Sequence, residues 1–309
     1  MPDVKEFYFP SSTGKSQIYA RMWLPDGEVR ATVQLAHGIA EYIERYDDFA
    51  KFLAENGIAV CGNDHLGHGK SIDLPENRGF FAEKNGWDYV VADMKSLHEL
   101  IMKEFPGKPC VLFGHSMGSF LSRTYLIKHP KDFDAAILCG TGHQSGALVE
   151  GGLMLAKIIT KRHGPKYQSS TLNDIAFGAY NKGFNAAPGE TAWLSRDREM
   201  VKKYDADPLC GFVPTCSLFG DMMGGVKFIK NPKNLLLMNK KMPVFFIAGG
   251  DDPVGDKGKG VERAYKSFVD AGMEDVMMQL YPGGRHEILN EICREKVYSD
   301  VLDWINCKI

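Results

Sequence analysis

The sequence predicts an α/β fold in which a mostly parallel sheet is flanked by helices and interrupted by a helical insertion. Short apolar runs typical of buried strands alternate with segments of helical periodicity in the first part of the chain. This alternation stops after residue 141 and resumes near residue 241. One apolar run also passes through a tight, glycine-rich turn directly into a helix. Together these observations indicate a parallel sheet with a segment inserted between two of its strands.

Each element follows from local patterns. We expect a hairpin of strands Val4–Phe9 and Gln17–Leu24, joined by the turn at residues 11–14. A buried strand at Ala31–Ala36 precedes a helix at Ile43–Asn56, whose apolar residues recur at helical spacing. Residues 62–71 are rich in turn formers and are predicted to be a loop. The other expected elements are strand Ile58–Cys61, helix Trp87–Phe105, strand Cys110–Phe113, helix Phe120–Ile127, strand Ala135–Cys139, strand Met242–Ala248, helix Gly258–Ala271, strand Val276–Tyr281 and helix Cys293–Ile305.

The middle of the chain has a different character. Residues 142–240 contain helical patches, many glycines and methionines, and no clear strand. We therefore expect a core formed by residues 1–141 and 241–309, with a helical cap, or lid, at residues 142–240. A chain of 309 residues is long enough to bury a large core beside such an insertion.

Composition excludes several classes of protein. Hydrophobic residues make up 44% and charged residues 25% of the chain, which is ordinary for a soluble globular protein. The formal net charge of −2 gives no general attraction for nucleic acid or for an anionic membrane. The seven cysteines are scattered without a C-x-x-C pair, which favours a reducing compartment. We expect no signal peptide and no membrane-spanning segment, and hence a cytoplasmic location.

The turn after the strand Cys110–Phe113 carries the motif on which the predicted chemistry depends. Its residues read GHSMG, from Gly114 to Gly118, and a helix follows. In this context the G-x-S-x-G motif is typical of a nucleophile elbow, in which only glycines fit beside Ser116 and its hydroxyl is pushed to the tip. The N-terminus of the next helix then points at the reacting centre. The alternative is a passive serine in a glycine-rich turn.

A serine nucleophile needs a base, and the base needs an orienting acid. Such groups collect at the carboxyl ends of parallel strands. His286 follows the last strand, whereas Asp251, Asp252 and, a little further on, Asp256 follow the strand before it. Asp252 directly precedes Pro253, which favours an extended conformation suited to presenting a side chain, so we favour Asp252 over Asp251 as the acid. Alternatively, His286 caps a helix or lies at the surface, and the aspartates form turns or cap helices.

An oxyanion hole needs two backbone N–H groups. Met117 supplies one by its position after the nucleophile, and the loop after Ala31–Ala36 offers the N–H of Ile39. We expect His37 to hold that loop through hydrogen bonds. A metal site of His37, His65 and His68 is the weaker alternative, because these histidines come with no further ligand cluster. We expect neither a metal nor another cofactor.

With these residues in place, the sequence resembles a known family. The segments HGIAEYIERY, NDHLGHGKS, FGHSMGS, GDDPVG and GGRHEIL together are similar to the α/β-hydrolase-fold serine hydrolases of the monoacylglycerol lipase and lysophospholipase family. The resemblance covers most of residues 30–140 and 240–305, and the insertion matches only in position. It implies that Ser116 is the nucleophile, Asp252 the acid, His286 the base, and Ile39 with Met117 the oxyanion donors. These are the roles that the residues themselves indicate. The order serine, aspartate, histidine is that of the α/β-hydrolases.

The resemblance also implies a substrate-binding role for Glu41 and Arg45. In monoacylglycerol lipases, an acidic residue two positions past the oxyanion residue and an arginine four positions further contact the polar glycerol end. The alternative is an ion pair at the start of a helix. The family often has glycine where this chain has Ala40 and Ile43, and arginine where it has His65, so the headgroup pocket departs from the family pattern.

Two apolar stretches of the insertion are candidates for an acyl-binding surface. They are Ala147–Val149 with Leu153–Leu155 and Ile158–Ile159, and the set Phe219, Met222, Met223, Val226 and Phe228. Methionine-rich surface is suited to lining an adaptable acyl slot. The alternative is that these residues pack the cap onto the core. We also expect transient contact between the cap and a membrane surface.

The expected activity is hydrolysis of a small-molecule acyl ester, namely a single-chain lipid such as a monoacylglycerol or a lysophospholipid. One alternative is a small-ester esterase or an aminopeptidase of the same fold. The peptidases usually carry proline after a Gly-Gly pair in the oxyanion loop, and residues 37–40 contain no proline. The other alternative is a non-catalytic ligand-binding protein, against which the complete set of serine, aspartate and histidine argues.

Overall fold

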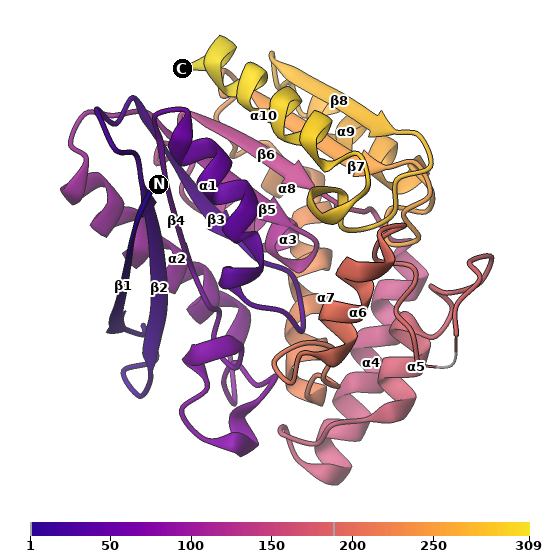
Figure 1. Ribbon diagram of the computed structural model, residues 1–309. Coiled ribbons are helices and arrows are strands. Elements are labelled where there is room, and N and C mark those ends of the chain that lie inside the picture. Colours follow the sequence, from indigo (N-terminus) through magenta and orange to yellow (C-terminus); the bar gives the residue numbers. More distant parts are fainter. Residues whose placement is uncertain (1, 188) are drawn as a thin grey trace.

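The computed structural model describes residues 2–187 and 189–309, in which helices cover both faces of one eight-stranded sheet (Figure 1). The strands are β1 (Asp3–Pro10), β2 (Gln17–Leu24), β3 (Ala31–Ala36), β4 (Ile58–Asn63), β5 (Cys110–His115), β6 (Ala135–Cys139), β7 (Val244–Gly249) and β8 (Val276–Tyr281). The α-helices are α1 (Asp47–Glu55), α2 (Gly86–Glu104), α3 (Met117–Lys128), α4 (Gly146–His163), α5 (Ser170–Phe177), α6 (Arg198–Ala206), α7 (Cys216–Lys230), α8 (Pro232–Leu235), α9 (Lys259–Asp270) and α10 (Arg294–Lys308). Short 3₁₀ turns are η1 (Ile43–Tyr46), η2 (Gly69–Ser71), η3 (Pro75–Asn77) and η4 (Ile288–Asn290).

The sheet is mostly parallel, as predicted. Its strand order is β1-β2-β4-β3-β5-β6-β7-β8. The hairpin β1–β2 is antiparallel and β2 pairs antiparallel with β4, whereas all neighbours from β4 to β8 pair in parallel. The parallel strands therefore end at one common edge, where side chains from distant parts of the chain meet.

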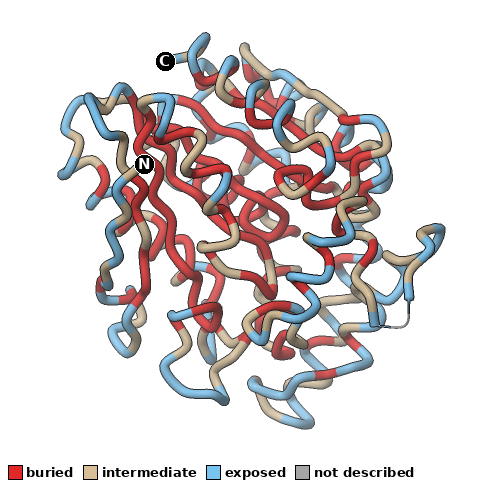
Figure 2. The backbone as a smooth tube through the Cα atoms, viewed as in Figure 1, coloured by how far each residue is buried: buried red, intermediate tan, exposed pale blue. Residues whose placement is uncertain are grey.

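Alternate residues of each central strand enter two separate cores. In β5, Val111 and Phe113 pack with α1 and α10, whereas Cys110 and Leu112 face α2 and α3. This follows from the period of two residues in a strand, and it explains why strands covered on both faces read as continuous apolar runs. Figure 2 shows the result: the central strands β3 to β7 are buried, whereas the edge strands β1 and β8 are partly exposed.

Several elements differ from their predicted bounds by a few residues. Strands β4 and β5 continue to Asn63 and His115, and α3 begins at Met117, directly after the turn. The predicted helix from Ile43 starts instead with the 3₁₀ turn η1 before α1. There the N–H of Ile43 donates to the Asp64 carboxylate at 2.8 Å, which ties this turn to the loop after β4.

Helices α4 to α8 lie between β6 and β7, in the segment 142–240, which we call the insertion. Its described residues form no strand, and their one bridge pairs Gln168 with Thr215. Helix α4 packs against α7, and α7 packs against α2 and α3 of the core. Figure 1 shows the insertion at the edge of the sheet where the parallel strands end. No helix within residues 2–187 and 189–309 is both long and apolar enough to cross a membrane.

Candidate active site

Ser116 occupies the turn between β5 and α3 with an unusual backbone conformation. Its φ of 52° and ψ of −120° lie in a region that side-chain-bearing residues rarely adopt. Its N–H donates to the Cys139 carbonyl oxygen at 3.0 Å, which anchors the turn to the end of β6. Strain of this kind, held by surrounding contacts, is expected where a nucleophile must stand clear of the sheet.

The two glycines of the motif are required by close packing. A Cβ atom on Gly114 would lie 2.3 Å from Ser122 Oγ and 2.5 Å from the Gly118 carbonyl oxygen. A Cβ atom on Gly118 would lie 2.0 Å from the carbonyl oxygen of Ala36. The turn thus has room for hydrogen alone at these positions, as the sequence motif predicts.

His286 and Asp252 come together at the same edge of the sheet. Asp252 follows β7 and is fully buried, and both of its carboxylate oxygens lie 3.0 Å from His286 Nδ1. The Val254 N–H also donates to Asp252 Oδ1 at 2.8 Å. Asp251 is exposed, so the structure places Asp252 and not its neighbour against the histidine. Because Nδ1 donates to the carboxylate, Nε2 is the unprotonated nitrogen of the neutral ring.

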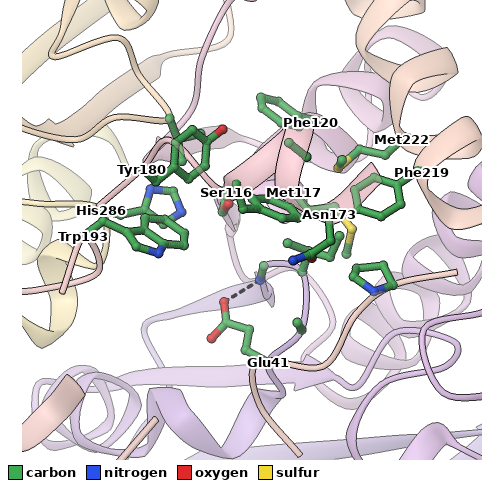
Figure 3. A pocket seen from close by; sticks show the side chains of 18 of the residues that line it. Glu41, Ser116, Met117, Phe120, Asn173, Tyr180, Trp193, Phe219, Met222 and His286 are labelled. Atoms are coloured by element: carbon green, nitrogen blue, oxygen red, sulfur yellow. Dashed lines mark hydrogen bonds between the residues drawn. The ribbon is translucent and has the colours of Figure 1, made fainter. Parts of the chain in front are cut away.

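His286 lies in a closed polar and aromatic environment. Its ring centroid is 5.1 Å from that of Trp193 and 4.7 Å from that of His115. Burial opposes protonation, but the charge and hydrogen bond of Asp252, together with the nearby carboxylates of Glu287 and Glu41, raise the pKa of His286 above its usual value. The imidazolium is therefore stabilised beside Ser116, and both side chains face the same cavity (Figure 3).

The two predicted oxyanion donors lie on the wall of that cavity. Ile39 and Met117 both line it together with Ser116. Met117 is the first residue of α3, whose first-turn N–H groups have no acceptor within the helix. Gly38 packs so closely on Ser116 that a Cβ atom on Gly38 would lie 3.2 Å from Ser116 Cβ. The loop at residues 38–39 is thus held against the elbow.

His37 holds this loop through its ring. Its Nε2 accepts the N–H of His65 at 2.9 Å, so Nδ1 carries the proton and donates to the Gly38 carbonyl oxygen at 2.7 Å. Burial lowers the pKa of His65 to about 3, that of His68 to about 4 and that of His37 well below its usual value, so all three neighbouring rings are neutral. Among the described residues, no group of three or more His, Cys, Asp or Glu side chains has the geometry of a metal site.

Glu41 and Arg45 form the buried ion pair that was the alternative to substrate contact. Arg45 Nη1 lies 2.7 Å from Glu41 Oε2, and the same guanidinium binds both oxygens of Glu287 at 2.7 Å. Glu41 lines the cavity, whereas Arg45 lies behind it. Burial raises the pKa of Glu41, while Arg45 lowers the pKa of Glu287 to about 2 in spite of burial. Substrate contact by Glu41 and Arg45 remains a prediction.

The cavity has a volume of about 250 Å³ and is mainly apolar. Some residues of both candidate stretches in the insertion line the cavity, namely Leu148, Phe219, Met222, Met223 and Val226. Val149 and Phe228 instead pack against the core, and Met154 and Ile158 are exposed. Both interpretations of these stretches therefore apply, each to different residues. The charged residues on the described part of the wall are Glu41 and Glu287, next to His286, with no lysine or arginine among them.

The structure adds site residues that the sequence pattern did not indicate. Trp193 and Leu194 of the insertion accept the backbone N–H groups of His286 and Glu287 at 3.3 and 2.7 Å. Tyr204 donates its hydroxyl to the Ala40 carbonyl oxygen at 3.1 Å. The only available signals were that Glu287 directly follows the predicted base and that the insertion contains isolated aromatic residues. Neither signal reveals a contact across so many residues of chain.

Comparison with known proteins agrees with this geometry. The sequence profile of the Hydrolase_4 family, described as serine aminopeptidase S33, matches residues 27–292. The monoacylglycerol lipase of Mycolicibacterium smegmatis is 28% identical over 302 residues, which is 96% of this chain and 95% of that protein. The human monoglyceride lipase is 24% identical over 94% of this chain and 86% of its own length. A thermostable carboxyl esterase from Bacillus coagulans, solved with glycerol, superposes with a TM-score of 0.92 at 27% identity, covering 99% of this chain and 98% of that one.

Proposed function

This chain belongs to the serine aminopeptidase S33 family of α/β-hydrolases, and we propose that it is a serine carboxylester hydrolase that cleaves monoacylglycerols. The observation that supports this most directly is the buried Asp252–His286 pair, which shares a largely apolar cavity with a strained Ser116. An apolar slot beside a base and a nucleophile suits an ester of one long acyl chain.

The proposed reaction has two similar halves. His286 Nε2 takes the proton of Ser116 as the serine oxygen attacks the ester carbonyl carbon. The carbonyl oxygen becomes an oxyanion that the N–H groups of Ile39 and Met117 stabilise. The bond to the glycerol oxygen then breaks, and the imidazolium protonates the departing glycerol. Water attacks the acyl-enzyme with the same base, which releases the fatty acid and restores Ser116.

The charge of the cavity wall favours glycerol over a phosphate-bearing headgroup. Among the described residues, the wall offers two glutamates and no lysine or arginine. A lysophospholipid would bring its phosphate charge towards carboxylates without a cation to receive it, which is costly in a partly desolvated site. Glycerol has neutral hydroxyl groups that can donate to Glu41. The wall therefore supports a monoacylglycerol as the preferred substrate.

The same carboxylates argue against an aminopeptidase. Binding a substrate's protonated amine needs a carboxylate whose oxygens are directed at that amine. Arg45 already pairs with both Glu41 and Glu287 through contacts of 2.7 Å. Both oxygens of Glu287 and one oxygen of Glu41 are therefore directed at Arg45, and no other carboxylate lies on the described part of the cavity wall.

A matched substrate series tests the proposal. We expect 1-monooleoylglycerol to be hydrolysed with a kcat/KM at least about tenfold above that of 1-oleoyl-lysophosphatidylcholine, and faster than an aminoacyl amide. Ser116→Ala should abolish all three activities. A higher rate on the lysophospholipid or the amide would overturn the substrate assignment, and full activity of the Ser116→Ala variant would overturn the mechanism.

Contact with a lipid surface through the insertion is a second part of the proposal. Leu148 and Ile175, which also line the cavity, and Met154 and Ile158 on α4 are each more than half accessible to solvent. Exposed basic residues lie at the end of α4 and just beyond it, namely Lys157, Lys161, Arg162 and Lys166. Apolar side chains bordered by basic ones suit a surface of lipid headgroups. Such contact would bring the monoacylglycerol to the cavity that the same helices line.

A further inference from the structure

Arg45 occupies a position between the two loops on which the proposed chemistry depends. We call residues 38–41 the oxyanion loop and residues 284–287 the base loop. The Arg45 guanidinium binds Glu41 Oε2 of the first loop and, with both of its terminal nitrogens, Glu287 of the second. All three contacts measure 2.7 Å, and the Arg45 side chain is 11% exposed. One side chain thus joins segments that are more than two hundred residues apart in the sequence.

Arg45, Glu41, Glu287 and their hydrogen bonds form a network, and its Glu41 side holds the oxyanion loop. Glu41 Oε1 accepts the N–H of Gly38 at 2.6 Å (Figure 3) and the hydroxyl of Tyr46 at 2.9 Å. Gly38 directly precedes Ile39, the proposed oxyanion donor, and packs on Ser116. The orientation of the Glu41 carboxylate therefore sets how the Ile39 peptide is presented to the reacting carbonyl.

At its second end, the network controls the base loop. Glu287 directly follows His286, and its Oε2 also accepts from Asn290 Nδ2 at 2.9 Å. Its backbone N–H donates to the Leu194 carbonyl oxygen at 2.7 Å. A displacement of Glu287 would thus be passed on to the imidazole through a single peptide unit.

The insertion closes over this network. The ring of Tyr204, on α6, lies 4.7 Å from the Arg45 guanidinium carbon, and its hydroxyl donates to the carbonyl oxygen of Ala40. The Gly211 N–H donates to the same oxygen at 3.0 Å. Ala40 has a positive φ of 54°, which is uncommon for a residue with a side chain, so these contacts hold a strained peptide next to Ile39.

We infer that Arg45 is a positioning residue that aligns the oxyanion loop with the base loop, and that it acts through Glu41 and Glu287 rather than by touching the substrate. This inference rests on the proposed ester hydrolysis. The planar, bidentate guanidinium suits the role, because it fixes the direction of both carboxylates and not only their distance. Lysine would keep the charge but not the geometry.

The test compares Arg45→Lys and Glu287→Gln with variants of exposed residues on α6, Arg198→Lys and Glu199→Gln. For hydrolysis of 1-monooleoylglycerol, we expect Arg45→Lys and Glu287→Gln each to lower kcat by about 10- to 100-fold while KM stays within about threefold. Misalignment of the two loops weakens the stabilisation of the transition state and leaves substrate binding largely unchanged. The α6 variants should match the wild type. Glu287→Gln should remain folded, since it keeps the shape and some hydrogen bonds of the side chain even if Arg45→Lys unfolds.

A pH profile separates alignment from a purely structural role. Glu287 raises the pKa of His286, so Glu287→Gln should move the acid limb of kcat/KM to lower pH, whereas loss of folded protein would lower the whole profile without moving it. Folded variants with wild-type kcat and an unmoved acid limb would overturn the inference.

The rate of Ser116 modification by a fluorophosphonate provides a readout that needs no natural substrate. If the wild type fails to cleave monoacylglycerol, the proposed function fails, but this rate still reports the alignment of nucleophile, base and oxyanion donors. A slower reaction in folded Glu287→Gln than in Glu199→Gln supports the positioning role, and equal rates overturn it.

Discussion

The Nδ1 atom of His286 lies 3.0 Å from both carboxylate oxygens of Asp252, and the carboxylate is completely buried. This contact also fixes the tautomer of the imidazole ring. Because Asp252 accepts the Nδ1 proton, the lone pair of the neutral ring is on Nε2, the nitrogen that is free to act as a base. The buried carboxylate also stabilises the imidazolium that would form in the proposed reaction.

Replacing Asp252 by asparagine should nearly abolish hydrolysis. Asparagine keeps the shape of the side chain but removes the charge and offers an N–H group to Nδ1, which favours the wrong tautomer. We expect kcat to fall by about 10⁴-fold, measured on a p-nitrophenyl ester. Asp251→Asn is the matched control, since Asp251 is exposed, and it should retain wild-type turnover. Equal losses in the two variants would contradict the assignment of the acid.

Activity should decline as the pH falls, following the protonation of His286. The base must be neutral, and the negative charge of Asp252 outweighs burial to raise the pKa of His286 above its ordinary value of 6.5. The acid limb of kcat/KM should therefore have its midpoint above pH 6.5, with activity present on the alkaline side and lost on the acidic side. Initial rates at constant ionic strength measure it. A midpoint clearly below that value would be inconsistent with the charge arrangement described.

Gly118→Ala should disrupt the elbow. The new methyl group would lie 2.0 Å from the Ala36 carbonyl oxygen, so the elbow and the strand end must separate. We expect about 1–3 kcal/mol less unfolding free energy, measured by urea denaturation, and at least about 100-fold lower kcat.

Gly151→Ala is the control for that substitution. Gly151 lies within α4, and a Cβ atom there would meet nothing within 4 Å. Alanine should stabilise the protein by about 0.5–1 kcal/mol, because it restricts the unfolded chain and favours the helix. Loss of stability from both substitutions would count against the packing described for the elbow.

Narrowing the apolar part of the cavity should shorten the acyl chain that the protein accepts. Ala176 on α5 lines the cavity and is half-buried, so tryptophan there would occupy space without opening the core. Ala176→Trp should lower kcat/KM on a sixteen-carbon ester by about tenfold or more while sparing a four-carbon ester. Ala179→Trp, at an exposed position outside the cavity, should leave the chain-length profile unchanged. The same loss on both esters would place the acyl chain elsewhere.

The exposed apolar face of α4 should contribute to lipid binding. The double variant Met154→Ser, Ile158→Ser should bind phosphatidylglycerol-containing vesicles at least about tenfold more weakly in a sedimentation assay. Leu236→Ser with Leu237→Ser removes a similarly exposed apolar pair outside that face, and vesicle binding should not change. Turnover of a soluble short-chain ester should be unaffected in both. Equal vesicle binding by the two double variants would argue against docking through α4.

Much of the fold could be predicted from short-range pattern. The apolar runs at β5 and β7 are continuous because both faces of those strands are covered, and helices such as α1 and α9 carry their apolar residues on one side. The elbow could also be predicted, because a backbone turn with room only for glycine on either side of Ser116 requires a short local motif in the sequence. The strand ends were less readable, since Asn63 and His115 continue the ladder as polar residues.

The sequence by itself determined the class of fold, the candidate nucleophile Ser116, and the order in which serine, aspartate and histidine follow the strands. Only the tertiary structure placed Asp252 rather than Asp251 against His286, and showed that Arg45 pairs with Glu41 and Glu287. It also decided which apolar residues of the insertion face the cavity and which face solvent. The physical reason is the range of the interactions. Turn geometry and periodic burial act between near neighbours in the chain, whereas the contacts of His286, Glu287 and Tyr204 join segments far apart in sequence, and no local pattern records them.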